Sequence, residues 1–402
     1  MEELESGLKS ALMKDGCAIL EGLLNQPDAD NRTDQQLHDL RSRTVQSLLG
    51  EFNLKRGYYR SENGEYSFPM DKQLGLLDRY TPGAQKLMLW AAATDGSFVE
   101  AEKTLSCIAG LNIPSSQIRR VVQQLAPKLQ QQQAELRYTD QKSAIPTMYI
   151  AYDGTGIPMR KEELKGRKGR QPDGSARTRE VKLGCVFTQH TSDKDGYPLR
   201  APGSTSYVAT LSGTDDFGPI ILAEARRRGL AYAQTSVVIG DGAKWIWNTA
   251  RIDFPDAIQI LDFYHACEHL MLLSETVHKD KPSADKAFRK WRSMMKRGRI
   301  NKISSLAMEM MPCSGMRRKA AMDQIVYLQT NAHRMRYDVF RKKGLFIGSG
   351  VVEAGCKSVV GKRAKQSGMM WSVSGAQNIL DLRCLILSNY FDNTWTNYKS
   401  AA

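Results

Sequence analysis

The sequence predicts an α/β protein in which a helical N-terminal region precedes a domain built on a mixed β-sheet. Before residue 140, apolar residues recur mostly at helical spacing. From residue 145, three β-forming segments of hairpin type are followed by alternating strands and helices. Hairpin strands followed by strand–helix alternation indicate a sheet with antiparallel and parallel parts. The 402 residues leave room for two or three domains with buried cores.

The first residues are expected to be mainly helical. Leucines and isoleucines recur at near-helical spacing over residues 1–50, with a break at a polar run that contains Pro27. Residues 52–75 are expected to form a small hairpin that turns at 62–64, where the sequence reads Glu-Asn-Gly. We therefore predict a helical DNA-binding and multimerisation region over residues 1–140.

Residues 97–127 predict a helix, a turn and a second helix. Ser97 is a plausible N-cap with an acidic residue three positions later, and Gly110 lies in the turn. This is the layout of a helix-turn-helix, whose second helix can enter a major groove, although any helical hairpin shares the pattern. The candidate readers of bases or phosphates on the second helix are Gln117, Arg119 and Arg120.

The second predicted domain spans residues 141–402. Five strands are expected, at residues 148–153, 182–190, 204–211, 236–241 and 257–262. Strongly basic helical sequence then interrupts the pattern at about 275–345, before a final helical region. The prediction is a mixed five-stranded sheet with a helical insertion.

The net charge and the cysteines of the sequence indicate which kind of partner the protein binds and in which cellular compartment it is found. The net charge of +14 and the pI near 9.4 favour a polyanionic partner, nucleic acid first, although a merely basic enzyme shows the same balance. The seven scattered cysteines form no CxxC pair, which argues against a zinc ribbon or a disulfide framework. The acidic N-terminus does not resemble a signal peptide, and no apolar run is long enough for a bilayer. A cytoplasmic protein without a membrane partner is expected.

Three acidic residues are the candidate catalytic group. Asp153 and Asp241 each follow an apolar strand and precede a glycine, and Glu353 follows a loop with the sequence Gly-Ser-Gly. Sites gather at the carboxyl ends of strands in open α/β sheets, and a glycine allows a sharp turn there. The alternative is that each acid is only a turn or cap residue, since Asp-Gly is a common turn dipeptide.

Three converging carboxylates would repel one another and raise their pKa values, unless divalent cations neutralise them. Oxygen-only ligands favour Mg²⁺ or Mn²⁺ over zinc. Two such ions can activate a water or a 3′-hydroxyl for in-line phosphoryl displacement. The sequence therefore predicts two Mg²⁺ or Mn²⁺ ions held by Asp153, Asp241 and Glu353.

A histidine-rich helix start follows the fifth predicted strand. His265 and His269 lie four residues apart, but Glu268 is misplaced for the His-Glu-x-x-His zinc signature. A role for Asp262 and His265 behind the metal ligands or on a phosphate is one interpretation, and a structural histidine is the other.

Basic tracts flank the three acids. Between the first two strands a loop rich in lysine and arginine would bind phosphates of flanking DNA, or is simply a solvated loop. The candidate DNA-binding residues in these tracts are Arg167, Lys168, Arg170, Lys362 and Arg363. Trp371 follows a small Ser-Gly pair and is a candidate neighbour of the site, whereas core packing is the better interpretation for the other tryptophans.

Five motifs together resemble a known family. The segments YDGTGIP, GDGAKWIW, LDFYHACEHL, GSGVVEAGCKSVVGKR and SGMMWS resemble the ISKra family of bacterial insertion-sequence transposases, which are similar to Mutator-like enzymes. The resemblance covers about residues 80–400. It implies an RNase H-like catalytic core with a helical insertion and a DDE triad of Asp153, Asp241 and Glu353 that binds two Mg²⁺ ions. Asp262 and His265 match the D-x-x-H motif of the Mutator-like relatives. Two features depart from the family: the CxxC segment is missing, and Met370 replaces an arginine.

The function expected from these features is a DDE transposase. It would bind terminal inverted repeats in double-stranded DNA, cleave a strand at the element end and transfer the 3′-hydroxyl to target DNA. A homodimer or higher oligomer is expected because two ends are joined, and nucleoid association follows from the substrate. The alternatives are an RNase H-like nuclease without strand transfer, a domesticated DNA-binding protein without catalysis, and a phosphate-handling, kinase-like fold.

Overall fold

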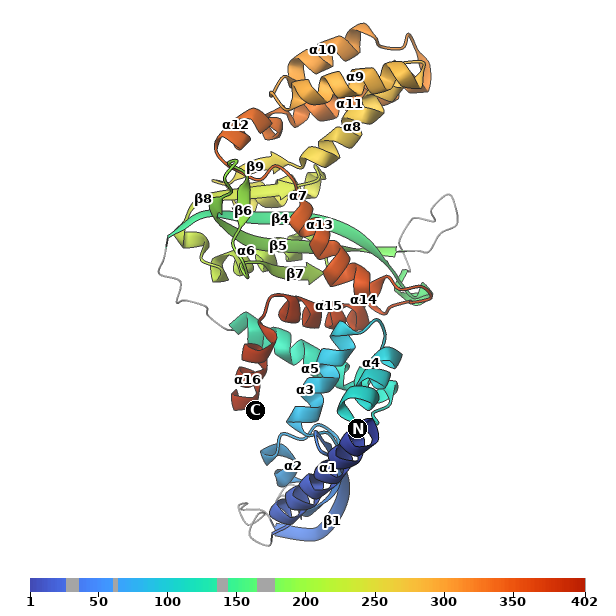
Figure 1. The fold of residues 1–402 in the computed structure, drawn as a ribbon, viewed down its shortest axis with the longest axis vertical. Helices are drawn as coiled ribbons and strands as arrows, with labels where there is room; N and C mark the ends of the chain where they lie inside the picture. Colours follow the sequence, from blue (N-terminus) through green and yellow to red (C-terminus); the bar gives the residue numbers. More distant parts are fainter. Residues whose placement is uncertain (27–35, 61–63, 136–143, 165–177, 402) are drawn as a thin grey trace. The chain divides into compact units, whose positions relative to one another are not determined.

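The computed structural model describes residues 1–26, 36–60, 64–135, 144–164 and 178–401. The chain divides into two compact units (Figure 1). Unit 1 comprises Met1–Leu136 together with Ser374–Ala402, and unit 2 comprises Arg137–Val373. The sequence placed residues 374–402 in the second domain, whereas the structure groups them with the N-terminal residues.

Unit 1 begins with a helix packed on a small antiparallel sheet. Helix α1 (Glu2–Leu24) lies along strand β2 (Gly50–Arg60), which pairs with β1 (Gln36–Ser47) and briefly with β3 (Tyr66–Ser67). The prediction of helix for residues 37–50 was wrong, because most of them belong to β1. Alternate residues of β2 are buried along most of its length, because pairing with β1 turns them toward α1. Of the predicted hairpin at 52–75 the described residues show the short β2–β3 pairing, and most of its expected turn at 62–64 lies outside the described residues.

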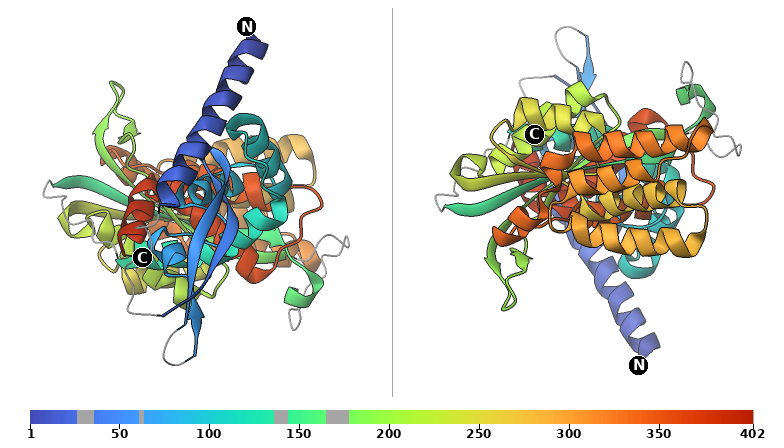
Figure 2. Two further views of the ribbon diagram at one scale, coloured as in Figure 1. Left: turned by 90° about the horizontal axis from the view of Figure 1, so that it is seen from below. Right: turned by 90° about the horizontal axis from the view of Figure 1, so that it is seen from above.

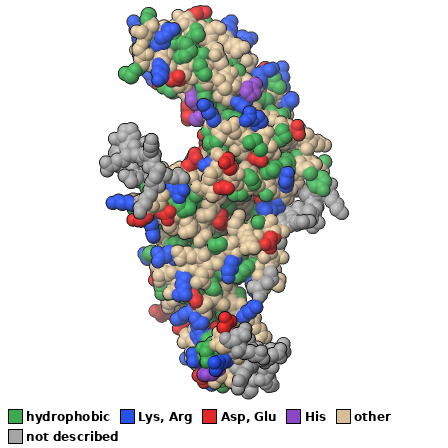
Figure 3. Space-filling model, turned by 180° about the vertical axis from the view of Figure 1, so that it is seen from behind, with side chains coloured by type: hydrophobic (Ala, Val, Ile, Leu, Met, Phe, Trp, Pro, Cys, Tyr) green, Lys and Arg blue, Asp and Glu red, His purple; other side chains and the backbone are tan. Residues whose placement is uncertain are grey.

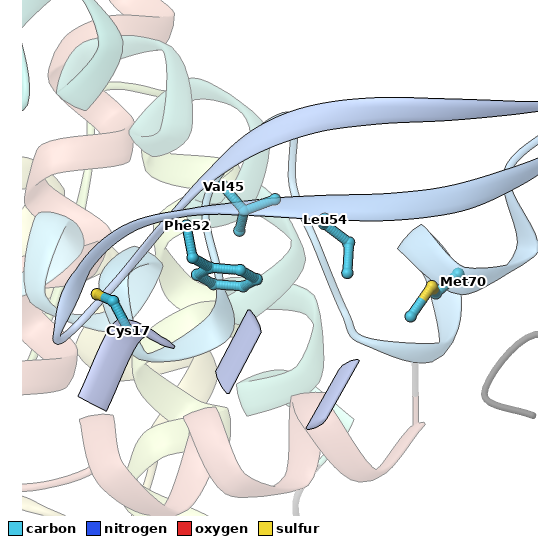
Figure 4. Close-up of a cluster of buried hydrophobic side chains, with 5 residues drawn as sticks. All are labelled: Cys17, Val45, Phe52, Leu54 and Met70. Carbon is cyan, nitrogen blue, oxygen red and sulfur yellow. The ribbon is translucent and has the colours of Figure 1, made fainter. Parts of the chain in front are cut away.

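An apolar cluster fixes this helix-on-sheet arrangement. It joins Cys17 of α1, Val45 of β1, Phe52 and Leu54 of β2, and Met70 (Figure 4). All five side chains are buried, so the two long strands have one packed face and one solvated face.

The remainder of unit 1 is helical. Its helices are α2 (Pro69–Gln73), α3 (Pro82–Thr94), α4 (Phe98–Thr104) with its π-helical extension η2 (Leu105–Ala109), α5 (Ser115–Glu135), α15 (Val373–Leu387) and α16 (Phe391–Ala401). The carboxy-terminal helices are tied to the amino-terminal ones by polar contacts. Thr394 donates a hydrogen bond to Gln133, and Arg383 donates to the carbonyl of Ala93.

The predicted helix–turn–helix segment is built largely as expected. Ser97 caps α4 by accepting a hydrogen bond from the Glu100 N–H, and Gly110 takes a left-handed conformation at φ 71° in the turn. The expected apolar face of α5 is buried, and α5 begins at the expected Ser115. This confirms two helices joined by a turn.

Unit 2 is built on a six-stranded mixed sheet. Its strands are β4 (Ile145–Pro158), β5 (Thr178–Ser192), β6 (Pro198–Arg200), β7 (Ser206–Thr210), β8 (Ala233–Gly240) and β9 (Ile258–Leu261). The order is β6-β5-β4-β8-β9, with β7 also paired to β5. Strand β4 is antiparallel to β5 and parallel to β8, and β8 is parallel to β9. The mixed sheet is confirmed, but the predicted five strands become six because the expected turn region forms β6.

Helices cover both faces of this sheet. Gly184 of β5 approaches Ile221 of α6 (Thr214–Arg227), whereas its neighbour Leu183 approaches Gly355 of α13 (Gly350–Gly355). Because successive strand residues point to opposite faces, α6 and α13 pack on opposite sides. Helix α7 (Lys244–Asp253) follows β8 and packs against α6.

A helical bundle stands between β9 and α13 in the chain. It consists of α8 (Phe263–Val277), α9 (Lys281–Met295), α10 (Ile300–Glu309), α11 (Gly315–Thr330), η5 (Ala332–Met335) and α12 (Tyr337–Lys342). Helices α9, α10 and α11 lie side by side (Figure 2). After α13 the chain continues as the π-helix η6 (Cys356–Gly361) and α14 (Lys362–Ala364); the remaining short elements are η3 (Lys161–Leu164) and η4 (Leu230–Tyr232). No helix among the described residues is both long and apolar enough to cross a bilayer.

The N-terminal cluster yields a stability prediction. Phe52→Ala removes a ring that is 4% exposed and is expected to destabilise this part of unit 1 by about 3 kcal/mol or more, through lost burial and a residual cavity. Hydrogen exchange of the β1–β2 amides should become much faster. Leu40→Ala, at a β1 position that is 67% exposed, is the matched control and should leave exchange nearly unchanged. Equal protection in Phe52→Ala would contradict the proposed role of the cluster.

Candidate active site

Asp153 lies inside strand β4 and not on a turn. The sequence placed it where the strand ends, but β4 continues to Pro158 and stays paired with β5 along this stretch. Gly154 and Gly156 are extended strand residues whose missing side chains leave room for Glu180 and Thr178 of β5. Only the parallel pairing with β8 ends nearby, at Ala151 opposite Ile239. Asp153 is therefore partly exposed because its neighbouring strand stops, although its own strand does not.

The strand registers align three aspartates. Asp153 and Asp241 each lie two residues beyond the pair Ala151 and Ile239. Asp241 and Asp262 each lie one residue beyond the pair Gly240 and Leu261. Adjacent strands are about 4.8 Å apart, so the three carboxylates leave the same edge of the sheet in neighbouring positions.

Asp262 is the structural member of this group. It is 1% exposed and caps α8, with its Oδ1 accepting a hydrogen bond from the His265 N–H at 2.6 Å. Its Oδ2 accepts from the Ser349 N–H at 2.5 Å. Both oxygens are thus occupied by backbone donors, so Asp262 positions α8 and the loop that contains Ser349.

Ser349 connects Asp262 to the last predicted acid. Its hydroxyl donates a hydrogen bond to Glu353 Oε1 at 2.8 Å, while its N–H is held by Asp262. Helix α13, which contains Glu353, lies across β4 and β5 (Figure 1). Gly355 permits this close approach, because a Cβ there would lie 2.7 Å from the ring of Tyr207. The exposed Glu353 is thereby placed over the sheet near Asp153.

The environment of Asp153 disfavours its charge. Burial raises its pKa, and the negative charges of Asp241 and Glu353 raise it further. Hydrogen bonds from the Cys356 thiol and the Gly154 N–H lower the pKa but do not reverse the shift. Asp241 and Glu353 therefore both lie near enough to Asp153 to act on its charge. Burial and the Asp153 carboxylate in turn raise the pKa of the Cys356 thiol, which keeps it protonated as a donor.

Aromatic and imidazole rings from α8 and α11 cover the Asp241 side of the site. The Tyr327 hydroxyl donates to the backbone carbonyl of Asp241 at 3.1 Å, and its ring stacks on His269 at 3.6 Å. The Nε2 atoms of His265 and His269 lie 3.3 Å apart. Gly242 has φ 95°, and a Cβ there would lie 2.2 Å from the Tyr327 oxygen. Glycine is therefore required for Tyr327 to reach this carbonyl.

The structure places Asp241 and Glu353 within electrostatic range of Asp153 and adds three residues that the sequence did not single out. They are Ser349, Cys356 and Tyr327. The spacing of Cys356, three residues after Glu353, is a usable signal because such residues share a helix face. Tyr327 offers no local signal, since its contact with Asp241 spans 86 residues. Within the described residues, no three His, Cys, Asp or Glu side chains are grouped so as to hold a metal ion.

The predicted DNA-binding residues differ in their surroundings. Arg119 and Lys362 are exposed and Gln117 is half-buried, whereas Arg120 forms an ion pair with Asp78 at 3.2 Å. Arg363 is 1% exposed and lies over a tryptophan ring, so it is part of the core and not available for a surface contact. The predicted residues Arg167, Lys168 and Arg170 lie outside the described residues.

Trp371 belongs to the packing at the far end of β4. It is buried, its indole N–H donates to the Ala364 carbonyl at 3.1 Å, and its backbone bridges to Met159. Met159 lies six residues beyond Asp153, or about 20 Å along an extended strand. Trp371 therefore does not lie beside the acids, although the sequence had made it a candidate neighbour of them.

Positive charge is distributed over both units. Figure 3 shows Lys and Arg side chains interspersed with apolar and acidic ones on one face of the molecule. A basic protein with dispersed cations is suited to contact a polyanion at several places.

Comparisons with known proteins establish little about identity. Residues 1–185 match an uncharacterised protein family, UPF0236, which is fewer than half of the 402 residues. No curated protein matches the chain. A chain of the solved Drosophila P element transposase strand transfer complex aligns at 8% identity over 80% of this chain and 94% of that chain, with a TM-score of 0.33. A TM-score that low does not establish a shared fold, so the function must be argued from the site itself.

The raised pKa of Asp153 yields a pH-dependent stability prediction. The folded protein binds the proton of the Asp153 carboxyl group more tightly than the unfolded chain does. This tighter binding contributes fully to the free energy of unfolding below the unfolded pKa, which is near 3.9, and the contribution is lost as the pH rises through the folded pKa. Asp153→Asn should therefore stabilise the metal-free protein more at pH 7 than near pH 3.9. Urea midpoints in chelator at the two pH values measure the difference. Asp256→Asn, an exposed acid before β9, should change neither midpoint, and a variant less stable at pH 7 would refute the assignment.

Proposed function

We propose that this chain is a metal-dependent DNA strand-processing enzyme of the DDE transposase class. The observation that supports it most is that Asp241, at the end of β8, and Glu353, on α13, both lie close enough to Asp153 of β4 to raise the pKa of its carboxyl group, which burial raises first. Burial and the negative charges of Asp241 and Glu353 disfavour the charged form of Asp153. Such a site is costly for folding alone, which favours a functional reason for it.

The oxygen donors of the three acids suit Mg²⁺ or Mn²⁺ by their chemistry, and because they are not grouped as a ready metal site in the described residues, their side chains would have to move toward a bound ion. The three carboxylates offer hard oxygen ligands, and cations would relieve the repulsion that raises the pKa of Asp153. Asp153 interacts with both other acids, so it is the residue best placed to contribute to two sites, with Asp241 in one and Glu353 in the other. When bound, two such ions would activate a water or a 3′-hydroxyl and stabilise the leaving oxygen.

The residues around the acids would hold this arrangement in place. Ser349 fixes one Glu353 oxygen and is itself fixed by the buried Asp262. Cys356 and the Gly154 N–H orient Asp153, and the Asp241 carboxylate accepts from the Ala243 N–H at 2.9 Å. Each acid therefore has a donor that limits its rotation, which is what pre-organisation for phosphoryl transfer requires.

The resemblance to ISKra transposases gives this proposal its finer form. We propose that unit 2 is an RNase H-like core, supported by four antiparallel strands, β4–β7, followed by the parallel strands β8 and β9, and by the helices α8–α12 before Glu353. We further propose that α4 and α5 form a DNA-reading helix-turn-helix, with Gln117 and Arg119 toward the groove. Cleavage at a transposon end and transfer of the 3′-hydroxyl to target DNA, in a homodimer or larger assembly, would follow.

The central test is metal-dependent cleavage. Asp153→Asn, Asp241→Asn and Glu353→Gln should each lower the rate of Mg²⁺- or Mn²⁺-dependent cutting of labelled duplex DNA by roughly 100-fold or more, because each removes a ligand charge. Mn²⁺ binding, followed by calorimetry, should weaken in the same variants.

Asp256→Asn is the matched control, because it removes one exposed carboxylate before β9, at the opposite end of the strand from Asp262. Unchanged cutting in Asp241→Asn would eliminate the triad. Cutting without joined products would favour a nuclease, and DNA binding without metal-dependent cutting would favour a non-catalytic DNA-binding protein.

The proposed DNA-reading helix is tested separately. Arg119→Ala should weaken binding to duplex DNA roughly tenfold if the residue reads a base, or lower the salt slope of binding by about 1 if it contacts a phosphate. Lys128→Ala removes an exposed cation farther along the same helix and serves as the control. Equal effects of the two changes on affinity and salt slope would speak against groove recognition by α5. Fluorescence anisotropy across a salt series provides both quantities.

A further inference from the structure

Unit 2 contains a pocket that the proposed catalytic group does not use. It has a volume of ≈ 540 Å³ and is formed by the β5–β6 turn, the start of α8, the end of α9 and the stretch from α12 to α13. This volume lies in the range of pockets that enclose small organic ligands. Its wall includes Gly348 and Gly350, which flank Ser349, so it adjoins the loop that fixes Glu353.

Three cations line the pocket. Arg292 and Lys296 come from the end of α9, and Arg341 comes from α12. The Arg292 guanidinium and the Lys296 ammonium lie 5.7 Å and 5.6 Å from the centre of the Phe263 ring. None of the three forms an ion pair with another described residue. The lining of the pocket includes one acidic residue, Asp195. The pocket therefore has an excess of positive charge that suits a phosphate.

Aromatic rings line the same pocket. Tyr264 is 64% exposed although it lies at the start of a well-packed helix, and Tyr197 from the β5–β6 turn is 57% exposed. The backbone passes close to Tyr264, because a Cβ on Gly348 would lie only 3.4 Å from its ring. Exposed tyrosine faces beside cations are the chemistry that recognises a nucleobase and its phosphate together.

We propose that this pocket takes one unpaired nucleotide of the DNA strand next to the catalytic acids. The phosphate is bound by Arg341 and Lys296, and the base stacks on Tyr264 or Tyr197. The inference rests on the proposed function only for its choice of DNA as the source of the nucleotide. Its consequence is that the protein prefers DNA with unpaired nucleotides over fully paired duplex.

The experiment measures binding of the full chain to two labelled DNAs of equal length, one blunt and one with a short single-stranded 3′ extension, in chelator so that no cutting occurs. Tyr264→Ala and Arg341→Ala should each weaken binding of the extended DNA at least about fivefold and change binding of the blunt duplex less than about twofold. Tyr232→Ala and Lys342→Ala are matched controls, since both are exposed and neither lines the pocket.

Each result has a defined meaning. Equal losses on both DNAs, or no loss on either, would overturn the pocket proposal. Competition by free dAMP or dTMP with the affinity of the extended DNA would also overturn it, since the pocket would then be a site for a free nucleotide. Asp241→Asn should retain the preference for the extended DNA. If the pocket variants behave as expected while metal-dependent cutting is absent, the pocket stands and the catalytic proposal fails.

Discussion

The pairing of the central strands of unit 2 and the packing of α13 on them are the constraint on which the candidate site depends, because they hold Asp241 and Glu353 near Asp153. The parallel pairing of β4 with β8 aligns the first two acids, and the packing of α13 on β4 and β5 brings the third. Burial and the neighbouring charges together raise the pKa of Asp153. Such an arrangement persists only because the sheet, with its buried Val, Ile and Tyr side chains, imposes the geometry on the acids.

The buried Asp262 links the sheet to the elements that surround the site. It ends β9, caps α8 and holds the Ser349 N–H, so one side chain fixes the bundle helix and the loop before Glu353. The Ser349 hydroxyl in turn donates a hydrogen bond to the Glu353 carboxylate, which limits the movement of that side chain. The same loop forms a wall of the cationic and aromatic pocket, which explains how a ligand there would be coupled to the proposed catalytic acids. Tyr327 from α11 adds a second connection between the bundle and the Asp241 backbone.

Much of the fold follows from local patterns that the sequence contains. The apolar strands, the basic helices between β9 and α13, and the Ser97-capped helical pair were predicted because periodicity, caps and glycine turns act over a few residues. The acids were identifiable because each ends or follows an apolar segment. Cys356 was overlooked, although its spacing from Glu353 placed it on the same helix face.

The sequence by itself determined the acids at or near the ends of apolar segments, the succession of hairpin strands and then strand–helix alternation in unit 2, and the excess of positive charge, since all three are properties of the linear chain. Only the tertiary structure decided that residues 38–47 form a strand, because pairing with β2 overrides their local helical pattern. It likewise decided that β4 runs past Asp153, that Arg363 is buried and that residues 374–402 join unit 1. Each of these outcomes depends on a partner far away in the sequence, and local propensity holds no information about distant partners.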